Sequence, residues 1–126
     1  MKKFNKDIGN LSEQLAINYL KENGHYIMDS NFKTHFGEVD IISKKNNLII
    51  ITEVKGRFNL NYGSPSEAVT FNKQHTIIKV AMSYIHMHNF YDYNLRFDVI
   101  EVFLNPSTNS YNINHIKDAF RVNWRI

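Results

Sequence analysis

Four charged residues in the first half of the chain have a spacing that can bring them together on two neighbouring strands. Glu38 and Asp40 lie in one predicted strand, and Glu53 and Lys55 lie in the next. The intervening pair Asn46–Asn47 is suited to a two-residue hairpin turn, because asparagine tolerates a positive φ. With that turn, Asp40 faces Glu53 and Glu38 faces Lys55. Side chains alternate along a strand, so all four project from one face of the hairpin.

Two carboxylates that face each other across a sheet repel, and they need either a cation or a proton. Lys55 supplies one positive charge, whereas Mg²⁺ or Mn²⁺ supplies two and prefers carboxylate oxygens. Asp40 and Glu53, together with the Val54 carbonyl, are therefore candidate ligands for such an ion. A metal held there beside an ammonium group suits the hydrolysis of phosphodiesters, with Lys55 orienting the attacking water or stabilising the transition state.

The same pattern also fits a hairpin with no catalytic role. Glu38 and Lys55 can form an ordinary cross-strand ion pair, with Asp40 and Glu53 on a solvated edge. A slip of one residue in the turn would send the charges to opposite faces of the hairpin. The metal-site interpretation therefore depends on the hairpin register.

The elements that must position these residues follow from hydrophobic periodicity and turn signals. Helical spacing predicts one helix that ends before Gly24 and a second that begins at Ser64-Pro65. The apolar, β-branched run before Lys55 indicates a central strand covered on both faces. The pattern is typical of a single α/β domain, a mixed β-sheet flanked by helices. The predicted helices span residues 7–23 and 64–85, the second with a break near Phe71–Asn72. The predicted strands span residues 25–33, 38–44, 48–55, 95–104 and 111–116.

Composition narrows the classes of protein that fit. The chain has 126 residues, which suits one domain. It contains no cysteine, which excludes disulfides, thiolate zinc sites and a cysteine nucleophile. The net charge of +3 and the pI of about 9.1 are compatible with nucleic-acid binding. No signal peptide or apolar membrane span is visible in the sequence, so we expect a cytoplasmic protein that does not enter a membrane.

Several motifs, taken in order, resemble a known nuclease family. Gly37-Glu38-Val39-Asp40 is followed, after twelve residues, by Glu53-Val54-Lys55-Gly56-Arg57. This pair of motifs resembles the PD-(D/E)xK nuclease superfamily. It is more similar still to the YraN-like family of bacterial proteins, which are related to archaeal Holliday-junction resolvases. The resemblance runs from Gly9 to Val102 and is continued by Gly9-Asn10-Leu11-Ser12-Glu13, Gly63-Ser64-Pro65-Ser66-Glu67-Ala68-Val69, Lys73-Gln74 and Arg96-Phe97-Asp98-Val99.

The resemblance implies a restriction-endonuclease-like core and a role for each matched residue. Asp40, Glu53 and Lys55 match the catalytic positions, and Glu13 matches a glutamate on the first helix that completes the acidic site of the resolvases. The implied metal ligands are Asp40, Glu53, Val54 and Glu13, with Mg²⁺ or Mn²⁺ as cofactor. Val39 replaces the proline of the superfamily name, a position without chemistry. The implied activity is that of an endonuclease on DNA, branched structures included, and the symmetric resolvases imply a homodimer.

Basic and polar residues beyond the acidic pair are candidates for contacts with nucleic acid. Arg57 lies two residues after Lys55, and Lys73 and Gln74 lie near a helix start, where backbone N–H groups favour phosphate. Each of these residues also fits a plain solvated surface. Two functional alternatives to the enzyme stay open on this sequence. One is a non-catalytic nucleic-acid-binding module that keeps the nuclease fold, and the other is an adaptor that docks a partner protein through the charged hairpin.

Overall fold

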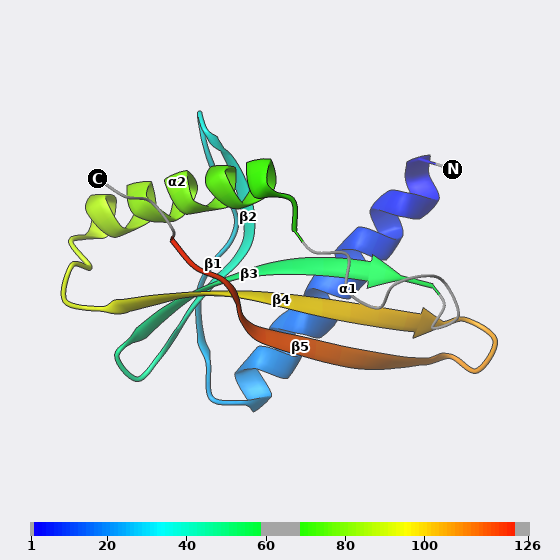
Figure 1. The fold of residues 1–126 in the computed structure, drawn as a ribbon. Coiled ribbons are helices and arrows are strands. Elements are labelled where there is room, and N and C mark those ends of the chain that lie inside the picture. Colours follow the sequence, from blue (N-terminus) through cyan, green and yellow to red (C-terminus); the bar gives the residue numbers. More distant parts are fainter. Residues whose placement is uncertain (1, 59–68, 123–126) are drawn as a thin grey trace.

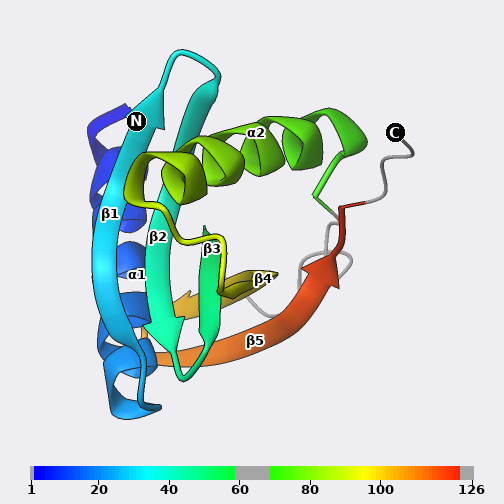
Figure 2. The ribbon, with the colours of Figure 1, turned by 90° about the vertical axis from the view of Figure 1, so that its left-hand side faces the viewer.

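The protein is a five-stranded mixed sheet with one helix on each side (Figures 1 and 2). The computed structural model describes residues 2–58 and 69–122. The sheet order is β1-β2-β3-β4-β5, and β3 and β4 are parallel while the other pairs are antiparallel. Helix α2 makes the connection that parallel strands require. The elements are α1 (Lys2–Glu22), β1 (Tyr26–Thr34), β2 (Gly37–Lys45), β3 (Leu48–Arg57), α2 (Phe71–His88), β4 (Asn94–Asn105) and β5 (Ser110–Phe120).

The α/β fold with a mixed sheet and flanking helices is confirmed, but several element boundaries differ from prediction. Helix α1 begins five residues early, at Lys2, and α2 ends three residues late, at His88. Helix α2 begins at Phe71, because Thr70 has an extended backbone and its hydroxyl accepts the Lys73 N–H at 3.2 Å as an N-cap. The earlier start signals at residues 64–67 lie outside the described residues. Strand β5 continues past its predicted end to Phe120, with an irregularity at Asp118, whose φ is +55°.

The predicted register of the β2–β3 hairpin is confirmed from the turn to the Ile41–Thr52 pair, and the predicted pair Glu38 and Lys55 lies beyond the paired register. Asn46 has a φ of +54°, as the turn requires, and Ile42 pairs with Ile51. The paired register ends at Ile41 and Thr52, and beyond this point the two strands separate. Glu53 alternates with Ile51, so its carboxylate comes from the α2 side of the sheet, and Asp40 lies across from it just where the ladder stops.

Two apolar cores hold the sheet from opposite sides. Helix α2 covers the larger core, built around Ile42, Ile51, Ile77, Tyr84 and Phe97. Helix α1 covers a smaller one, which includes Ala16, Leu20, Ile41, Ile100 and Val102. Strand β3 is therefore buried on both faces, as its sequence predicted, and each buried isoleucine contributes about 1.5–3 kcal/mol. Within the described chain, neither helix has the length and hydropathy to cross a bilayer.

A buried polar cluster ties β4 to β5 below α1. Asp98 is fully buried, and it accepts two hydrogen bonds from the Arg96 guanidinium at 2.8 Å and one from the His115 Nε2 at 2.7 Å. Burial raises the pKa of Asp98, but the hydrogen bonds from His115, Arg96 and the Asp118 N–H outweigh it and hold the pKa at about 2. The Arg96-Phe97-Asp98-Val99 motif thus has a structural use in joining strands.

Helix α1 approaches β3 most closely at Gly56. A Cβ built at Gly56 would lie 2.1 Å from the Ser12 Oγ, 2.9 Å from the Ser12 Cβ and 3.2 Å from the Ile8 Cγ2. Two of these contacts are shorter than any ordinary packing distance, so a side chain at this position must push the helix away. The glycine of the Glu53-Val54-Lys55-Gly56-Arg57 motif therefore sets the distance between α1 and the strand that carries the acidic residue.

We expect Gly56→Ala to lower the free energy of unfolding by about 1–3 kcal/mol, the cost of overpacking a filled interface. Gly9→Ala is the matched control. Gly9 lies in α1, the helix that packs against Gly56, and a Cβ built at Gly9 meets nothing within 4 Å. Alanine there should raise stability by about 0.5–1 kcal/mol through helix propensity. Chemical denaturation of the two variants checks both effects, and a harmless Gly56→Ala would contradict the close approach.

Candidate active site

The acidic pair occupies the point where β2 and β3 separate. The Val54 N–H donates to the Asp40 Oδ2 at 2.8 Å, and the Asp40 N–H donates to the Glu53 Oε1 at a longer 3.4 Å. Each carboxylate thus accepts a backbone N–H from the opposite strand, where the next rung of the ladder would otherwise be. The structure therefore brings Asp40 and Glu53 together across the hairpin, as the spacing predicted.

The surroundings of the pair disfavour two negative charges. Glu53 is 7% exposed. Burial and the neighbouring Asp40 carboxylate together raise the pKa of Glu53 to about 8, against the lowering effect of Lys73. Burial also raises the pKa of Asp40, and the hydrogen bond from the Val54 N–H opposes that rise. The protein holds these two acids where one of them keeps a proton unless more positive charge arrives.

Lys73 supplies part of the missing charge. Its Nζ lies 3.9 Å from the Glu53 Oε2, and the side chain is 55% exposed. The sequence placed Lys73 near a helix start as a DNA contact; the structure puts it beside the acidic pair. Gln74 has a different use in the structure, since its amide donates to the Val69 carbonyl at 2.8 Å and holds the segment before α2.

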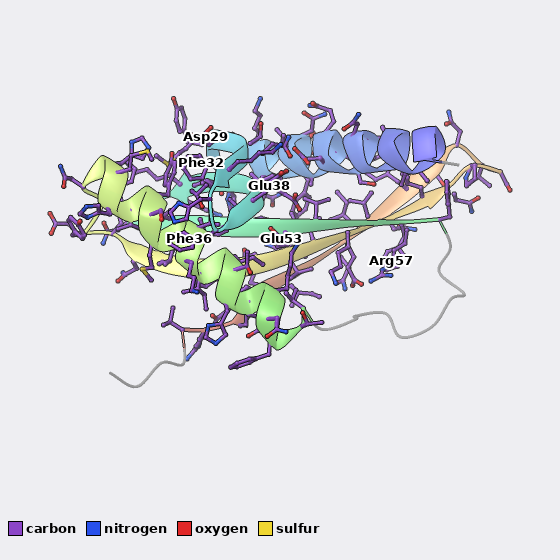
Figure 3. All side chains as sticks on the ribbon, turned by 90° about the horizontal axis from the view of Figure 1, so that it is seen from above. Asp29, Phe32, Phe36, Glu38, Glu53 and Arg57 are labelled. Carbon is purple, nitrogen blue, oxygen red and sulfur yellow. The ribbon has the colours of Figure 1, made fainter. Side chains whose placement is uncertain are left out.

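Two further carboxylates lie near the pair. Glu13 on α1 accepts a hydrogen bond from the Asn31 amide at 2.7 Å, and its pKa is raised by burial and by Asp40. Glu38 forms an ion pair of 3.6 Å with Lys33, its neighbour on β1. Figure 3 shows Glu38 and Glu53 between α1 and the start of α2. In the described part of the chain no three His, Cys, Asp or Glu side chains converge as a ready metal site, so Glu13 as a ligand stays a prediction.

Charged residues continue along β3 beyond Glu53. Lys55 and Arg57 follow at alternate positions, and Lys55 is in register with Glu101 of β4. Glu101 is 1% exposed; it accepts the Asn114 amide at 2.8 Å and lies 3.6 Å from the Arg57 Nε. Arg57, predicted to contact DNA, thus has a buried carboxylate beside it. Lys55 lies between that carboxylate and Glu53, next to the acidic pair along its own strand.

Glu101 was missed by the sequence interpretation, although a signal for it exists. The α2-facing positions of β4 read Phe97, Val99, Glu101 and Phe103, so one acid stands in an otherwise apolar row. A carboxylate on a buried face requires a cation or a hydrogen-bond donor nearby. The row thus signals a partner, but it does not identify Arg57, because strand register between β3 and β4 is set by the α2 connection.

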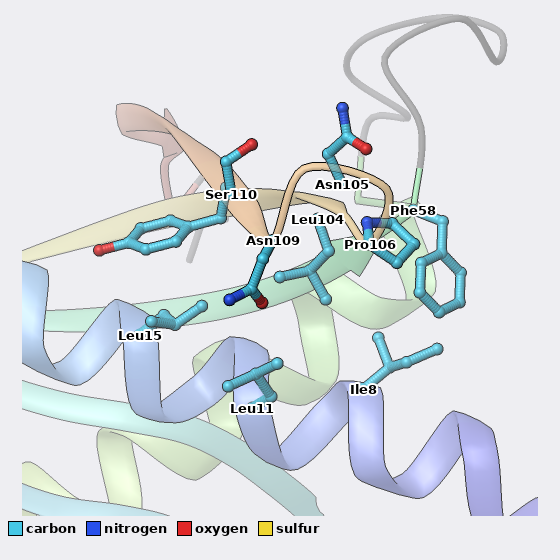
Figure 4. A pocket seen from close by; sticks show the side chains of 10 residues that line it. Ile8, Leu11, Leu15, Phe58, Leu104, Asn105, Pro106, Asn109 and Ser110 are labelled. Carbon is cyan, nitrogen blue, oxygen red and sulfur yellow. The ribbon is translucent and has the colours of Figure 1, made fainter.

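A separate pocket of about 490 Å³ lies between the first half of α1 and the β4–β5 hairpin (Figure 4). Leu11 and Leu15 line it from α1. Each is two residues away from Glu13, so both lie on the opposite side of the helix from Glu13. Its other lining residues are Ile8, Phe58, Leu104, Asn105, Pro106, Asn109, Ser110 and Tyr111. The pocket has no charged lining residue and is distinct from the acidic pair.

The raised pKa of Glu53 predicts a pH-dependent stability. In a buffer that contains a chelator, Glu53 keeps its proton in the folded protein from pH 4.5, its ordinary pKa, up to about pH 8. In the unfolded chain Glu53 has lost its proton over this range. Stability from this group is therefore greatest below pH 4.5 and falls as the pH rises towards 8. Glu53→Gln removes the titration, so the variant should gain stability over the native protein across this window. Denaturation at several pH values measures the gain, and a pH-independent difference would contradict the shift.

The pairing of Arg57 with Glu101 predicts strong coupling in a double-mutant cycle. Arg57→Met leaves a buried carboxylate without this cation and should cost about 3 kcal/mol of stability. Glu101→Gln in the same chain should restore most of that loss, because the uncompensated charge is gone. The free energies of unfolding of the four proteins give the coupling, and purely additive losses would remove Arg57 from this structural role.

Comparison with known proteins places the chain in a family. The model of the family described as "Uncharacterised protein family UPF0102" matches residues 12–102. A UPF0102 protein of Clostridium beijerinckii is 59% identical over 123 residues, which cover 98% of this chain and 100% of that relative. One of Clostridium botulinum is 57% identical, covering 96% and 99%. One of Clostridium perfringens is 44% identical, covering 97% and 100%. Since both the family model and these relatives span most of the sequence, the chain belongs to the UPF0102 family.

Proposed function

We propose that this protein is a Mg²⁺- or Mn²⁺-dependent endonuclease that hydrolyses phosphodiester bonds in DNA, with an active site formed by Asp40, Glu53 and Lys55. The observation that carries the proposal is the opposed pair Asp40 and Glu53, held at the end of a strand ladder with both pKa values raised. Burying two like charges opposes folding unless a proton or a cation compensates them, and a bound divalent cation is such a compensation. The resemblance to the PD-(D/E)xK superfamily and the YraN-like family supports the same assignment from the motif residues.

The donor set fits a hard divalent cation. Asp40 and Glu53 offer carboxylate oxygens on neighbouring strands, and Val54 adds a backbone carbonyl beside them, which are the ligand types that Mg²⁺ and Mn²⁺ prefer. These three residues would hold the ion, with Glu13 nearby on α1. When bound, the ion would neutralise charge on the phosphate and lower the pKa of the attacking water.

The side chains around the pair have distinct proposed roles. Lys55 lies two residues after Glu53 on the same strand and orients the water or stabilises the negative charge of the transition state. Lys73 offsets the charge of Glu53 and, being half exposed, is also placed to contact a substrate phosphate. Glu101, in register with Lys55, places a negative charge on the neighbouring strand near that ammonium group. Glu53 must lose its proton to take up a cation, so binding strengthens as the pH rises.

A non-catalytic nucleic-acid-binding module is the second candidate function. The observation that favours it is the ion pair between Lys73 and Glu53, because a lysine already meets part of the need for positive charge. Such a module needs the basic residues but not the ion. Hydrolysis of DNA therefore separates the two functions. A homodimer, like the choice among branched, flapped and single-stranded DNA, stays a prediction.

The test is hydrolysis of labelled DNA of several shapes in Mn²⁺ and Mg²⁺. Asp40→Asn and Glu53→Gln should abolish cleavage while the fold survives, because each removes a charged ligand. Lys55→Ala should slow the reaction by about 10²-fold or more, the effect of losing one group that stabilises the transition state. Glu22→Gln, which removes an exposed carboxylate at the end of α1, is the control and should cleave like the native protein. Full activity in Asp40→Asn or Glu53→Gln would overturn the site.

A further inference from the structure

The tip of the β1–β2 hairpin carries aromatic side chains that the turn does not need. Thr34 pairs with Gly37, so His35 and Phe36 are the two turn residues. Neither residue has a positive φ, so the turn accepts most residue types at both positions and does not require aromatic side chains. Here Phe36 is 42% exposed and its ring centroid lies 4.0 Å from that of His35. The hairpin rises beyond the rest of the sheet (Figures 1 and 2), so these rings stand at a projecting point of the molecule.

One lysine lies against this aromatic tip, and two more lie further along the elements that meet there. The Lys79 Nζ lies 5.7 Å from the centroid of the Phe36 ring. Lys33, three residues before Phe36 on β1, is 73% exposed, and Lys73, six residues before Lys79 on α2, is 55% exposed. An exposed ring beside a lysine, with further exposed lysines along the same elements, is an arrangement that stacks a base and contacts the neighbouring phosphates.

The tip is also held at a fixed place relative to the acidic pair. A Cβ built at Gly37 would lie 2.5 Å from the Thr76 Cγ2, so the hairpin packs directly against α2. Along that helix, Lys79 lies beside Phe36 and Lys73 lies beside Glu53. Six helical residues separate the two lysines by about 9 Å. Helix α2 therefore acts as a rigid spacer between the aromatic tip and the acidic residue.

We propose that these residues bind an unpaired nucleic-acid strand, with a base stacked on Phe36 and phosphates contacting Lys33, Lys73 and Lys79. The inference rests on the proposed function of the acidic pair and names its substrate class: a single strand, or the single-stranded part of a larger structure. An unpaired base can present its face to the Phe36 ring, whereas in a duplex each base face is covered by its neighbours. We call the residues Lys33, His35, Phe36, Lys73, Thr76 and Lys79 the strand-binding surface.

The spacing of the strand-binding surface also predicts a position. Lys73 and Lys79 are about 9 Å apart along the axis of α2, so one short segment of a strand can reach both lysines. The base on Phe36 is therefore within a few nucleotides of the phosphate at Glu53. An abasic site at that distance from the cleaved bond removes the stacking partner and leaves the backbone intact.

Binding to oligonucleotides in a chelator, where no hydrolysis occurs, tests the inference on the full chain. Fluorescence anisotropy gives Kd for a short oligothymidine and for a duplex of equal length. Phe36→Leu should weaken binding of the oligothymidine by about 10-fold, the effect of losing one base stack, and leave duplex binding unchanged. Phe71→Leu is the matched control: Phe71 is a 68% exposed phenylalanine whose ring also contacts a histidine, His75, but it points away from Lys73 on α2. It should bind both ligands like the native protein.

A second pair of variants tests the cations of the strand-binding surface. Lys79→Gln should lower the slope of log Kd against log salt for the oligothymidine by about 0.7, as expected for one phosphate contact on a single strand. Lys21→Gln, at an exposed lysine in the last turn of α1, should leave the slope unchanged. An unchanged slope in Lys79→Gln contradicts its contact with phosphate.

Other outcomes separate this inference from the proposed function. Equal loss of duplex and single-strand binding in Phe36→Leu, or no loss at all, overturns the strand-binding surface even if Mn²⁺-dependent cleavage by the native protein proceeds. Conversely, a selective loss in Phe36→Leu supports the surface even if no cleavage is found, and then only the hydrolytic function fails. Circular dichroism and thermal melting of each variant show that the fold is intact.

Discussion

Electrostatic repulsion between Asp40 and Glu53 is the constraint around which this structure is organised. The hairpin holds the two carboxylates against each other through backbone hydrogen bonds, and the sheet buries them where charge is poorly solvated. Neither carboxylate can move away without losing its hydrogen bond from a backbone N–H of the opposite strand. The conflict therefore persists in the folded protein, and a proton, a lysine or a divalent cation must relieve it.

The other elements bring charge to this point. Strand β3 is buried on both sides and supplies Glu53 and Lys55 from one rigid segment. Helix α2, which the parallel pairing of β3 and β4 requires, delivers Lys73 with its first turn. Helix α1 approaches β3 at Gly56 and carries Glu13 to the other side of the pair. The folding topology and the charge pattern of the site are thus linked, since each connection places one ionisable group.

Much of this arrangement follows from local sequence signals. Asn46–Asn47 set the hairpin register, and period-two alternation then placed Asp40 against Glu53. Lys73 beside Glu53 and Arg57 beside Glu101 could not be predicted in the same way, because both contacts depend on how α2 and β4 return to β3. The predicted break near Phe71–Asn72 is found just before α2, where Thr70 caps the helix through its side chain. The extension of β5 past Asp118 depends on pairing with β4, which no local pattern reports.

Calorimetry of Mn²⁺ binding tests most directly whether the acidic pair is a cation site. It compares the native UPF0102 protein with Glu53→Gln and Asp40→Asn, and it requires no choice of substrate. We predict that the native protein binds Mn²⁺, more tightly as the pH rises towards 8, and that both variants lose the binding. The cation site would be contradicted if the native protein bound no Mn²⁺, with or without added DNA. It would also be contradicted if the variants bound Mn²⁺ as tightly as the native chain.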